Sequence, residues 1–256
     1  MITATFNKTK YAAIALGLSI ISIQANSQEA TASPAEKAAA PKLWSGSIDL
    51  GYTDLSGNTE ETSSNGKVAL KRKRDAWTYL LDASARSSKK DGERSAEKYE
   101  LFNRLRYNFQ PRNYVFGRAA YEEDHFSGLK YQATVSTGLG RNLIDRENMA
   151  WDIETGIGYR VSEADEGADS EDESEAIFRL ASDYTWQITK TAEFQQHIST
   201  EAGSDNTVST SETSLKLQVI GEVSLKLSYK VKYSETVPSG TKHADTETRT
   251  ALSYAF

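Results

Sequence analysis

Long runs in which apolar and polar residues alternate constrain the fold of this chain more than any other feature of its sequence. From Val223 to Tyr233 every second residue is apolar or aromatic, and the residues between them are serines and lysines. Alternation with a period of two is typical of a β-strand that has one face in an apolar environment. Strands of soluble proteins average about five or six residues, whereas a tilted strand that crosses a bilayer needs about 9–11. The longer runs of this chain therefore favour strands that cross a membrane.

Twelve such runs follow one another after residue 42. We expect strands at 43–53, 61–73, 76–88, 97–110, 113–124, 129–141, 149–162, 175–187, 191–202, 207–219, 222–234 and 244–256. The links after odd-numbered runs are long or polar, at 54–60, 89–96, 125–128, 163–174, 203–206 and 235–243. The links after even-numbered runs are mostly short, at 74–75, 111–112, 142–148, 188–190 and 220–221. An even number of strands, with long loops at one end and tight turns at the other, predicts an antiparallel up-and-down transmembrane β-barrel whose turns are periplasmic. A soluble two-sheet sandwich is the alternative that the pattern leaves open.

The residues that precede the first run predict export. Lys8 and Lys10 stand before an apolar segment at 11–23, and small residues permit cleavage after Ala25 or Ser27. We therefore expect residues 1–27 to be a signal peptide rather than a membrane anchor. Residues 28–42 are rich in alanine and proline and have no hydrophobic period, so a flexible leader is expected there, which could also enter the pore. The barrel itself is expected to span 43–256 and to lie in a bacterial outer membrane.

Charged residues fall mainly on the polar faces of these runs. Arginine or lysine facing lipid at the bilayer centre costs about 2–4 kcal/mol, so this segregation is expected of a membrane barrel. Eight charged side chains are candidates for lining the lumen, namely Glu100, Arg104, Arg106, Arg118, Glu122, Asp152, Glu154 and Arg160. Because unpaired charge in a confined space is costly, we favour pairing between these acids and bases over a role in solute selectivity.

Composition excludes several functions. The chain has no cysteine, which excludes disulfides, thiolate metal sites and a cysteine nucleophile. With 30 basic and 36 acidic residues, its net charge of −6 argues against nucleic acid as a partner. No cofactor and no metal site is predicted, and we do not expect an enzyme. The expected function is a narrow, porin-like channel, or a protein of envelope and salt-stress adaptation, with outer-membrane lipids and small solutes or ions as partners.

Two alternatives stay open. An outer-membrane lipase or esterase would need a Ser–His pair; His197 lies on the charged face near Glu193 and Ser199, but no motif selects a serine. The acidic segment 163–175 could bind a cation such as Ca²⁺, although a solvated, self-repelling loop is the simpler interpretation.

The end of the chain adds an independent signal. Leu252, Tyr254 and Phe256 alternate with small residues, and this ending resembles the assembly signal that the barrel-assembly machinery reads in outer-membrane barrels. Family resemblance is carried by five short motifs and this terminal residue, namely Trp44-Ser45-Gly46, Gly57-Asn58-Thr59, Tyr121-Glu122-Glu123-Asp124, Phe126-Ser127-Gly128, Gly138-Leu139-Gly140 and Phe256. Over residues 43–256 the chain resembles the salt-induced, YdiY-like outer-membrane proteins, domain of unknown function 481. The resemblance implies an outer-membrane location, and it implies no established activity and no catalytic residues.

Overall fold

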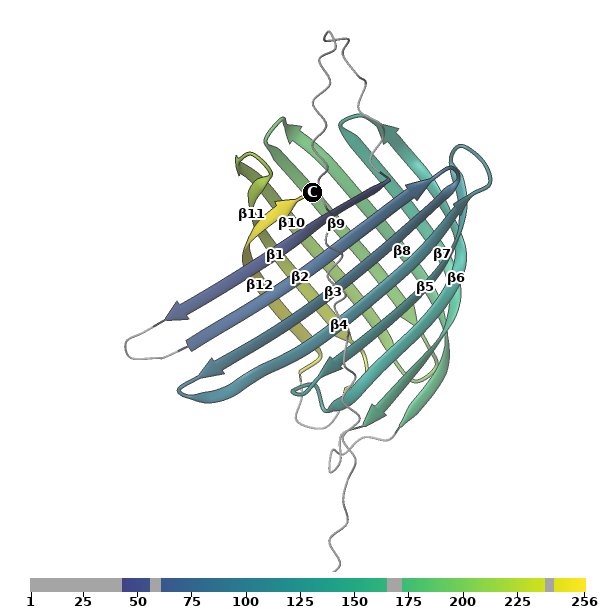
Figure 1. The fold of residues 1–256 in the computed structure, drawn as a ribbon. Coiled ribbons are helices and arrows are strands. Elements are labelled where there is room, and N and C mark those ends of the chain that lie inside the picture. The colour runs from purple at the N-terminus through teal and green to yellow at the C-terminus, as the bar shows by residue number, and fades with distance from the viewer. Residues whose placement is uncertain (1–42, 56–60, 165–171, 238–241) are drawn as a thin grey trace, which may run out of the picture. The chain divides into compact units, whose positions relative to one another are not determined.

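The computed structural model describes residues 43–55, 61–164, 172–237 and 242–256, which form a closed barrel of antiparallel strands (Figure 1). The strands are β1 (Trp44–Leu55), β2 (Glu61–Arg74), β3 (Trp77–Lys90), β4 (Glu93–Asn108), β5 (Asn113–Asp124), β6 (Leu129–Arg146), β7 (Met149–Ala164), β8 (Glu173–Thr189), β9 (Ala192–Ala202), β10 (Thr207–Ile220), β11 (Val223–Ser234) and β12 (Ala244–Ala255). Each strand pairs with its neighbours in sequence, and β1 also pairs with β12. The prediction of a twelve-stranded up-and-down barrel is confirmed, and the sandwich alternative is wrong because one sheet closes on itself. The expected signal peptide and leader lie outside the described residues.

The barrel is apolar outside and charged inside. Leu50 and Ile157 point outward and are 64% and 67% exposed, whereas Glu154 and Arg160 point inward and are 4% and 1% exposed. This arrangement reverses that of a soluble protein, whose large apolar side chains are mostly buried. No helix long and apolar enough to cross a membrane occurs in the described parts of the chain.

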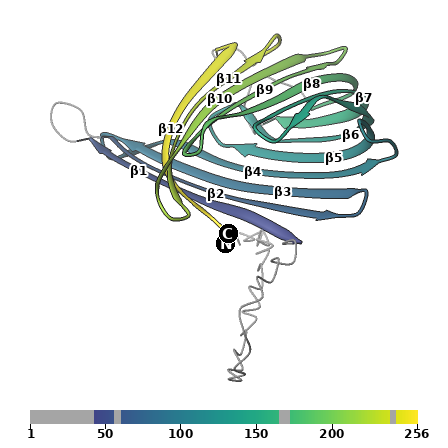
Figure 2. The same cartoon turned by 90° about the horizontal axis from the view of Figure 1, so that it is seen from above.

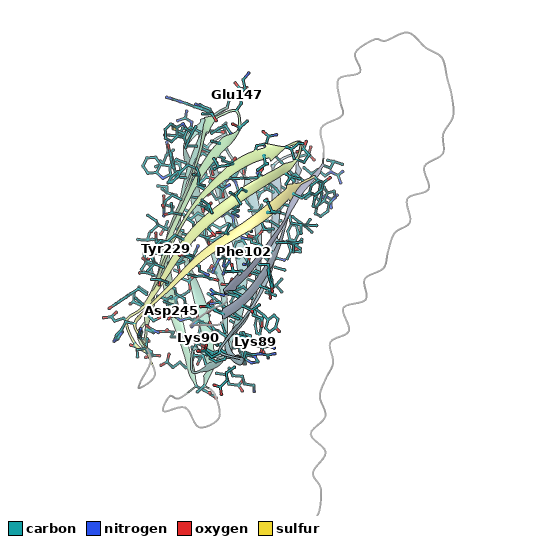
Figure 3. The ribbon with its side chains drawn as sticks, turned by 90° about the vertical axis from the view of Figure 1, so that its left-hand side faces the viewer. Lys89, Lys90, Phe102, Glu147, Tyr229 and Asp245 are labelled. Carbon is teal, nitrogen blue, oxygen red and sulfur yellow. The ribbon has the colours of Figure 1, made fainter. Side chains whose placement is uncertain are left out.

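Two expected links are wrong. The segment 89–96 was expected to be a loop because it is strongly polar, but β3 and β4 continue through it and meet at the two-residue turn Asp91-Gly92. Both turn residues have positive φ (52° and 83°), as the tight turns of β-hairpins require. On the opposite side, β6 runs on to Arg146 and leaves only 147–148 as the turn. Figure 3 places Glu147 at one end of the barrel and Lys89 and Lys90 at the other.

The closing seam between β1 and β12 is short. Four residue pairs join these strands, from Ser47 opposite Ala255 to Leu50 opposite Leu252, whereas twelve pairs join β1 to β2 (Figure 2). Two backbone hydrogen bonds extend the seam, because Gly46 and Phe256 each donate an N–H to the other's carbonyl, at 3.1 and 3.0 Å. A Cβ atom on Gly46 would lie 2.5 Å from the Phe256 ring, so this position requires glycine. The terminal phenylalanine therefore packs on the first strand where the barrel closes.

Candidate functional site

A central cavity of about 640 Å³ lies inside the barrel. Ten basic side chains line it, namely Lys67, Lys71, Arg104, Arg106, Arg118, Arg179, Lys226, Lys230, Lys232 and Arg249. Seven acidic side chains line it as well, namely Asp82, Glu100, Glu122, Asp152, Asp183, Glu201 and Glu212. The volume is within the range of small-molecule sites, and basic side chains outnumber acidic ones on the lining itself. Asp49, Glu154 and Glu247, which lie outside this lining, pair with its Lys226, Arg104 and Arg249.

Lysines of β11 reach across the lumen to the opposite wall. Lys230 Nζ lies 2.7 Å from Glu100 Oε1 on β4, and Lys232 Nζ lies 2.7 Å from Glu122 Oε1 on β5. Lys98 contacts the same two carboxylates from their own side, at 3.9 and 2.8 Å. Since β11 is a sheet neighbour of neither β4 nor β5, these contacts cross the interior and narrow it.

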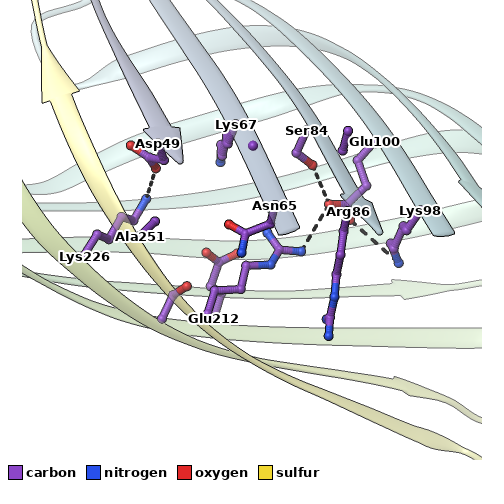
Figure 4. Close-up of a pocket in the computed structure, with 14 residues that line it drawn as sticks. Asp49, Asn65, Lys67, Ser84, Arg86, Lys98, Glu100, Glu212, Lys226 and Ala251 are labelled. Atoms are coloured by element: carbon purple, nitrogen blue, oxygen red, sulfur yellow. Dashed lines mark hydrogen bonds and ion pairs between the residues drawn. The ribbon is translucent and has the colours of Figure 1, made fainter. Parts of the chain in front are cut away.

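A second group of contacts holds the seam from within (Figure 4). Lys226 Nζ on β11 lies 3.2 Å from Asp49 Oδ2 on β1, so this ion pair spans β12. Arg86 on β3 pairs in the same region with Glu247 on β12. These inward ion pairs reinforce a seam that few backbone hydrogen bonds close.

The wall formed by β4 to β9 carries the arginine cluster. Arg104 lies 3.2 Å from Glu154 and 3.6 Å from Asp183, and Arg106 lies 3.4 Å from Asp152. Farther along the lumen, two arginines share one carboxylate: Glu201 Oε1 lies 3.0 Å from Arg118 Nη1 and 2.8 Å from Arg179 Nη1. Charged hydrogen bonds of this kind fix the side chains in place.

Glycine on β6 makes room for an aromatic ring beneath this cluster. Tyr114 is fully buried, its hydroxyl lies 3.1 Å from Glu154 Oε1, and the Arg106 guanidinium stacks 3.6 Å above its ring. A Cβ atom on Gly140 would lie 2.1 Å from the Tyr114 ring, and one on Gly138 would lie 2.1 Å from the Thr155 carbonyl oxygen. The Gly138-Leu139-Gly140 motif thus lets a buried tyrosine and a neighbouring strand approach closely.

The most buried ion pair lies at the loop end of the barrel. Arg160 on β7 pairs with Glu175 on β8, and both residues are less than 5% exposed. Glu175 Oε2 also accepts backbone N–H groups of Asp205 and Asn206, at 2.7 and 3.4 Å, and Arg160 donates to the Asn206 carbonyl. The pair therefore fixes the β9–β10 loop to the adjacent wall.

The eight expected lumen residues all lie on the inner side, but their pairing differs in part from the expectation. Arg104 and Arg106 meet Glu154 and Asp152. The other four meet residues outside the expected set: Arg118 meets Glu201, Arg160 meets Glu175, and Glu100 and Glu122 meet lysines. In the sequence, Glu175 is one of several acids in the segment 163–175, and Lys230 is one of several lysines on the polar face of the run at 222–234. Nothing local in the sequence distinguishes them, because their partners come from distant strands.

The structure also shows where the residues of the two alternative functions lie, the lipase or esterase and the cation-binding loop. His197 Nδ1 lies 2.6 Å from Asp183 Oδ1, and the pair borders the central cavity rather than the lipid-facing surface. The imidazole of His197 contacts Asp183 and, among the described residues, makes no hydrogen bond to a serine hydroxyl. Most of the acidic segment 163–175 lies outside the described residues, and no group of three metal-ligating side chains occurs in the parts of the chain that are described. Leu252, Tyr254 and Phe256 are exposed on the outer face at the seam.

A closed antiparallel barrel with an apolar outer face and a charged interior is the architecture of bacterial outer-membrane β-barrel proteins. The chain belongs to the family described as "Protein of unknown function, DUF481", which matches residues 48–256. It is 28% identical over 222 residues to the uncharacterized protein YdiY of Escherichia coli (strain K12), covering 86% of each chain. The NanC porin has a similar fold, with a TM-score of 0.52 at 8% identity over 82% of this chain and 98% of that chain. An outer membrane channel from Pseudomonas putida F1 matches with a TM-score of 0.49 at 11% identity, covering 88% and 100%.

Proposed function

We propose that this protein is a narrow outer-membrane channel for ions and small polar solutes, with a preference for anions. The observation that carries the proposal is the central cavity, whose lining has ten basic and seven acidic side chains. Rings of charged side chains set the sign of the ions that a pore admits, and basic rings favour anions. The fold that the chain shares with the NanC porin is one that can hold a pore.

Most of the lining charge is neutralised locally, which leaves few side chains to select solutes. Among the described residues that line the cavity, Lys71 has no acidic side chain within 4.0 Å, and Glu212 has no basic side chain within that distance, so one charge of each sign is left unpaired there. Lys230 and Lys232, in contrast, are held by carboxylates across the lumen. We assign the preference for anions to Lys71 and the narrowing of the lumen to Lys230 and Lys232.

The ion pairs that narrow the proposed channel are expected to weaken in high salt, and this response would link the channel to envelope adaptation. The Debye length falls from about 10 Å at 0.1 M to about 3 Å at 1 M ionic strength, so high salt weakens ion pairs that water can reach. The pairs of Lys230 and Lys232 are partly exposed, and their screening would widen the lumen. Conductance is therefore expected to rise more steeply than the salt concentration.

The experiment is to insert the purified barrel into a planar lipid bilayer and measure its reversal potential in a KCl gradient. We expect discrete current steps with anion preference, which Lys71→Glu reduces or reverses. Lys190→Glu is the matched control, because Lys190 lies in the β8–β9 turn. Complete absence of current from the folded barrel would overturn the proposal, and so would unchanged selectivity in Lys71→Glu.

The same preparation tests the enzymatic alternative. The His197–Asp183 pair resembles two thirds of a hydrolytic triad, but such chemistry also needs a nucleophile that the histidine can deprotonate. We expect no turnover of a fluorogenic ester or phospholipid. Hydrolysis that His197→Ala abolishes, in a variant that still folds, would replace the channel with an enzyme.

A further inference from the structure

The outer face of the barrel carries an apolar groove of about 630 Å³ that crosses β6 to β9 and begins beside the β4–β5 turn. Its apolar lining includes four side chains that point away from the lumen, namely Leu139, Ile153, Leu180 and Ile198. The shorter residues Thr155 and Ser182 alternate with them in the cross-strand register, where Leu139 pairs with Thr155 and Ile153 pairs with Ser182. Short side chains between long ones form a furrow that runs across the strands.

One charged residue stands at the turn-side end of this furrow. Arg141 lies opposite Asn113 and Ile153 in the sheet, is exposed, and lines the groove. No acidic side chain lies within ion-pair distance of Arg141 in the described parts of the chain. Arg72, which also faces outward near the turns, differs because its guanidinium lies 5.2 Å from the Trp44 ring centroid. Arg141 thus places a positive charge on a lipid-facing surface without a protein partner, an arrangement that a bound anion would stabilise.

We propose that the groove is a binding site for one phospholipid of the periplasmic leaflet. The headgroup phosphate accepts hydrogen bonds from the Arg141 guanidinium, whose planar donors suit phosphate oxygens. One acyl chain lies along the furrow against Leu139, Ile153 and Leu180. From β5 to β9 there are four interstrand spacings of about 4.8 Å, hence about 19 Å of furrow, which is comparable with an extended long acyl chain. Because the turns are expected in the periplasm, Arg141 lies at the headgroup level of that leaflet.

This site is separate from the lumen, so its test is independent of the proposed channel. The purified full-length barrel would be released from detergent micelles in a native mass spectrometer and titrated with dipalmitoyl phosphatidylglycerol. The variants are Arg141→Gln, which removes the charge, and Thr155→Leu, which fills the furrow. Arg146→Gln is the matched control, because Arg146 is also exposed on β6 but does not line the groove. A heat-modifiability gel verifies that each variant is folded.

We expect one saturable lipid adduct on the wild type and on Arg146→Gln. Arg141→Gln and Thr155→Leu should each weaken it at least about tenfold, a difference of about 1.4 kcal/mol. Equal binding by folded Arg141→Gln would overturn the proposal, and so would the absence of any discrete adduct on the wild type. Competition by millimolar inorganic phosphate alone would show a plain anion site and would refute the role of the acyl chain.

Discussion

Replacing Arg160 with methionine tests whether buried charge holds this barrel together. The substitution removes the cation from a pair whose two side chains are 2% and 1% exposed and leaves the Glu175 carboxylate buried. Removing one partner of a buried ion pair typically costs about 3–5 kcal/mol. Glu175 keeps its backbone hydrogen bonds from Asp205 and Asn206, so we expect a loss at the lower end, about 3 kcal/mol.

A second substitution separates the pair from its surroundings. Glu175→Gln keeps an oxygen that can accept the two backbone N–H groups but removes the negative charge. The double variant Arg160→Met/Glu175→Gln no longer buries an unpaired carboxylate, and we expect it to be more stable than Arg160→Met alone by about 1–2 kcal/mol. This recovery would identify the buried charge, rather than lost packing, as the source of the cost.

Urea unfolding of the purified barrel in lipid vesicles, followed by tryptophan fluorescence, measures these free energies. A band-shift gel at each urea concentration reports the folded fraction independently. The reasoning is refuted if Arg160→Met lies within 1 kcal/mol of the wild type, or if the two substitutions destabilise additively. Arg112→Met, in the exposed β4–β5 turn, is the control and should change stability by less than about 0.5 kcal/mol.

Three further predictions concern the wall, the lumen and the seam. Gly140→Ala should displace the buried Tyr114 ring and destabilise the barrel by about 1–3 kcal/mol in the same urea assay. Removing both cross-lumen lysines, in Lys230→Ala/Lys232→Ala, should raise single-channel conductance severalfold and flatten its dependence on salt; an unchanged conductance would show that they do not constrict the lumen. Phe256→Ala should lower the heat-modifiable fraction in outer membranes, and Phe126→Ala, at an exposed loop aromatic, should not.

The strands were predictable because their signal is local. A lipid-facing surface excludes charge at every second position. A run such as Val223–Tyr233 therefore indicates, within a dozen residues, both that it is a strand and which of its faces contacts lipid. The same logic failed at 89–96. There the polar strand ends lack the alternation and so resemble a loop, because beyond the apolar layer both faces of these strands are polar. Asp91-Gly92, a strong hairpin signal, was the local clue to the tight turn.

The pairing inside the barrel was less predictable, because it depends on the cross-section of the closed sheet. Lys230 and Glu100 are 130 residues apart and lie on strands that are not neighbours. Whether they meet is set by the tilt of the strands and by the stagger with which the barrel closes. The sequence therefore indicated which charges face inward, but the partners of Arg118 and Arg160 required the structure.

Inside this barrel, ion pairs join the walls in the way that apolar contacts join the elements of a soluble protein's core. Twelve strands enclose a wider interior than the strands of a small barrel, whose inward-pointing apolar side chains fill the space. In this barrel the apolar side chains face outward, toward lipid. The inner walls are joined instead by contacts such as Lys232 with Glu122 and Arg104 with Glu154. In the proposed channel, the stability of the barrel and the passage of solutes would thus depend on the same contacts. Variants that widen the lumen at Lys232 should also unfold at lower urea, whereas a change at Lys71, which has no such partner, should alter selectivity and leave stability unchanged.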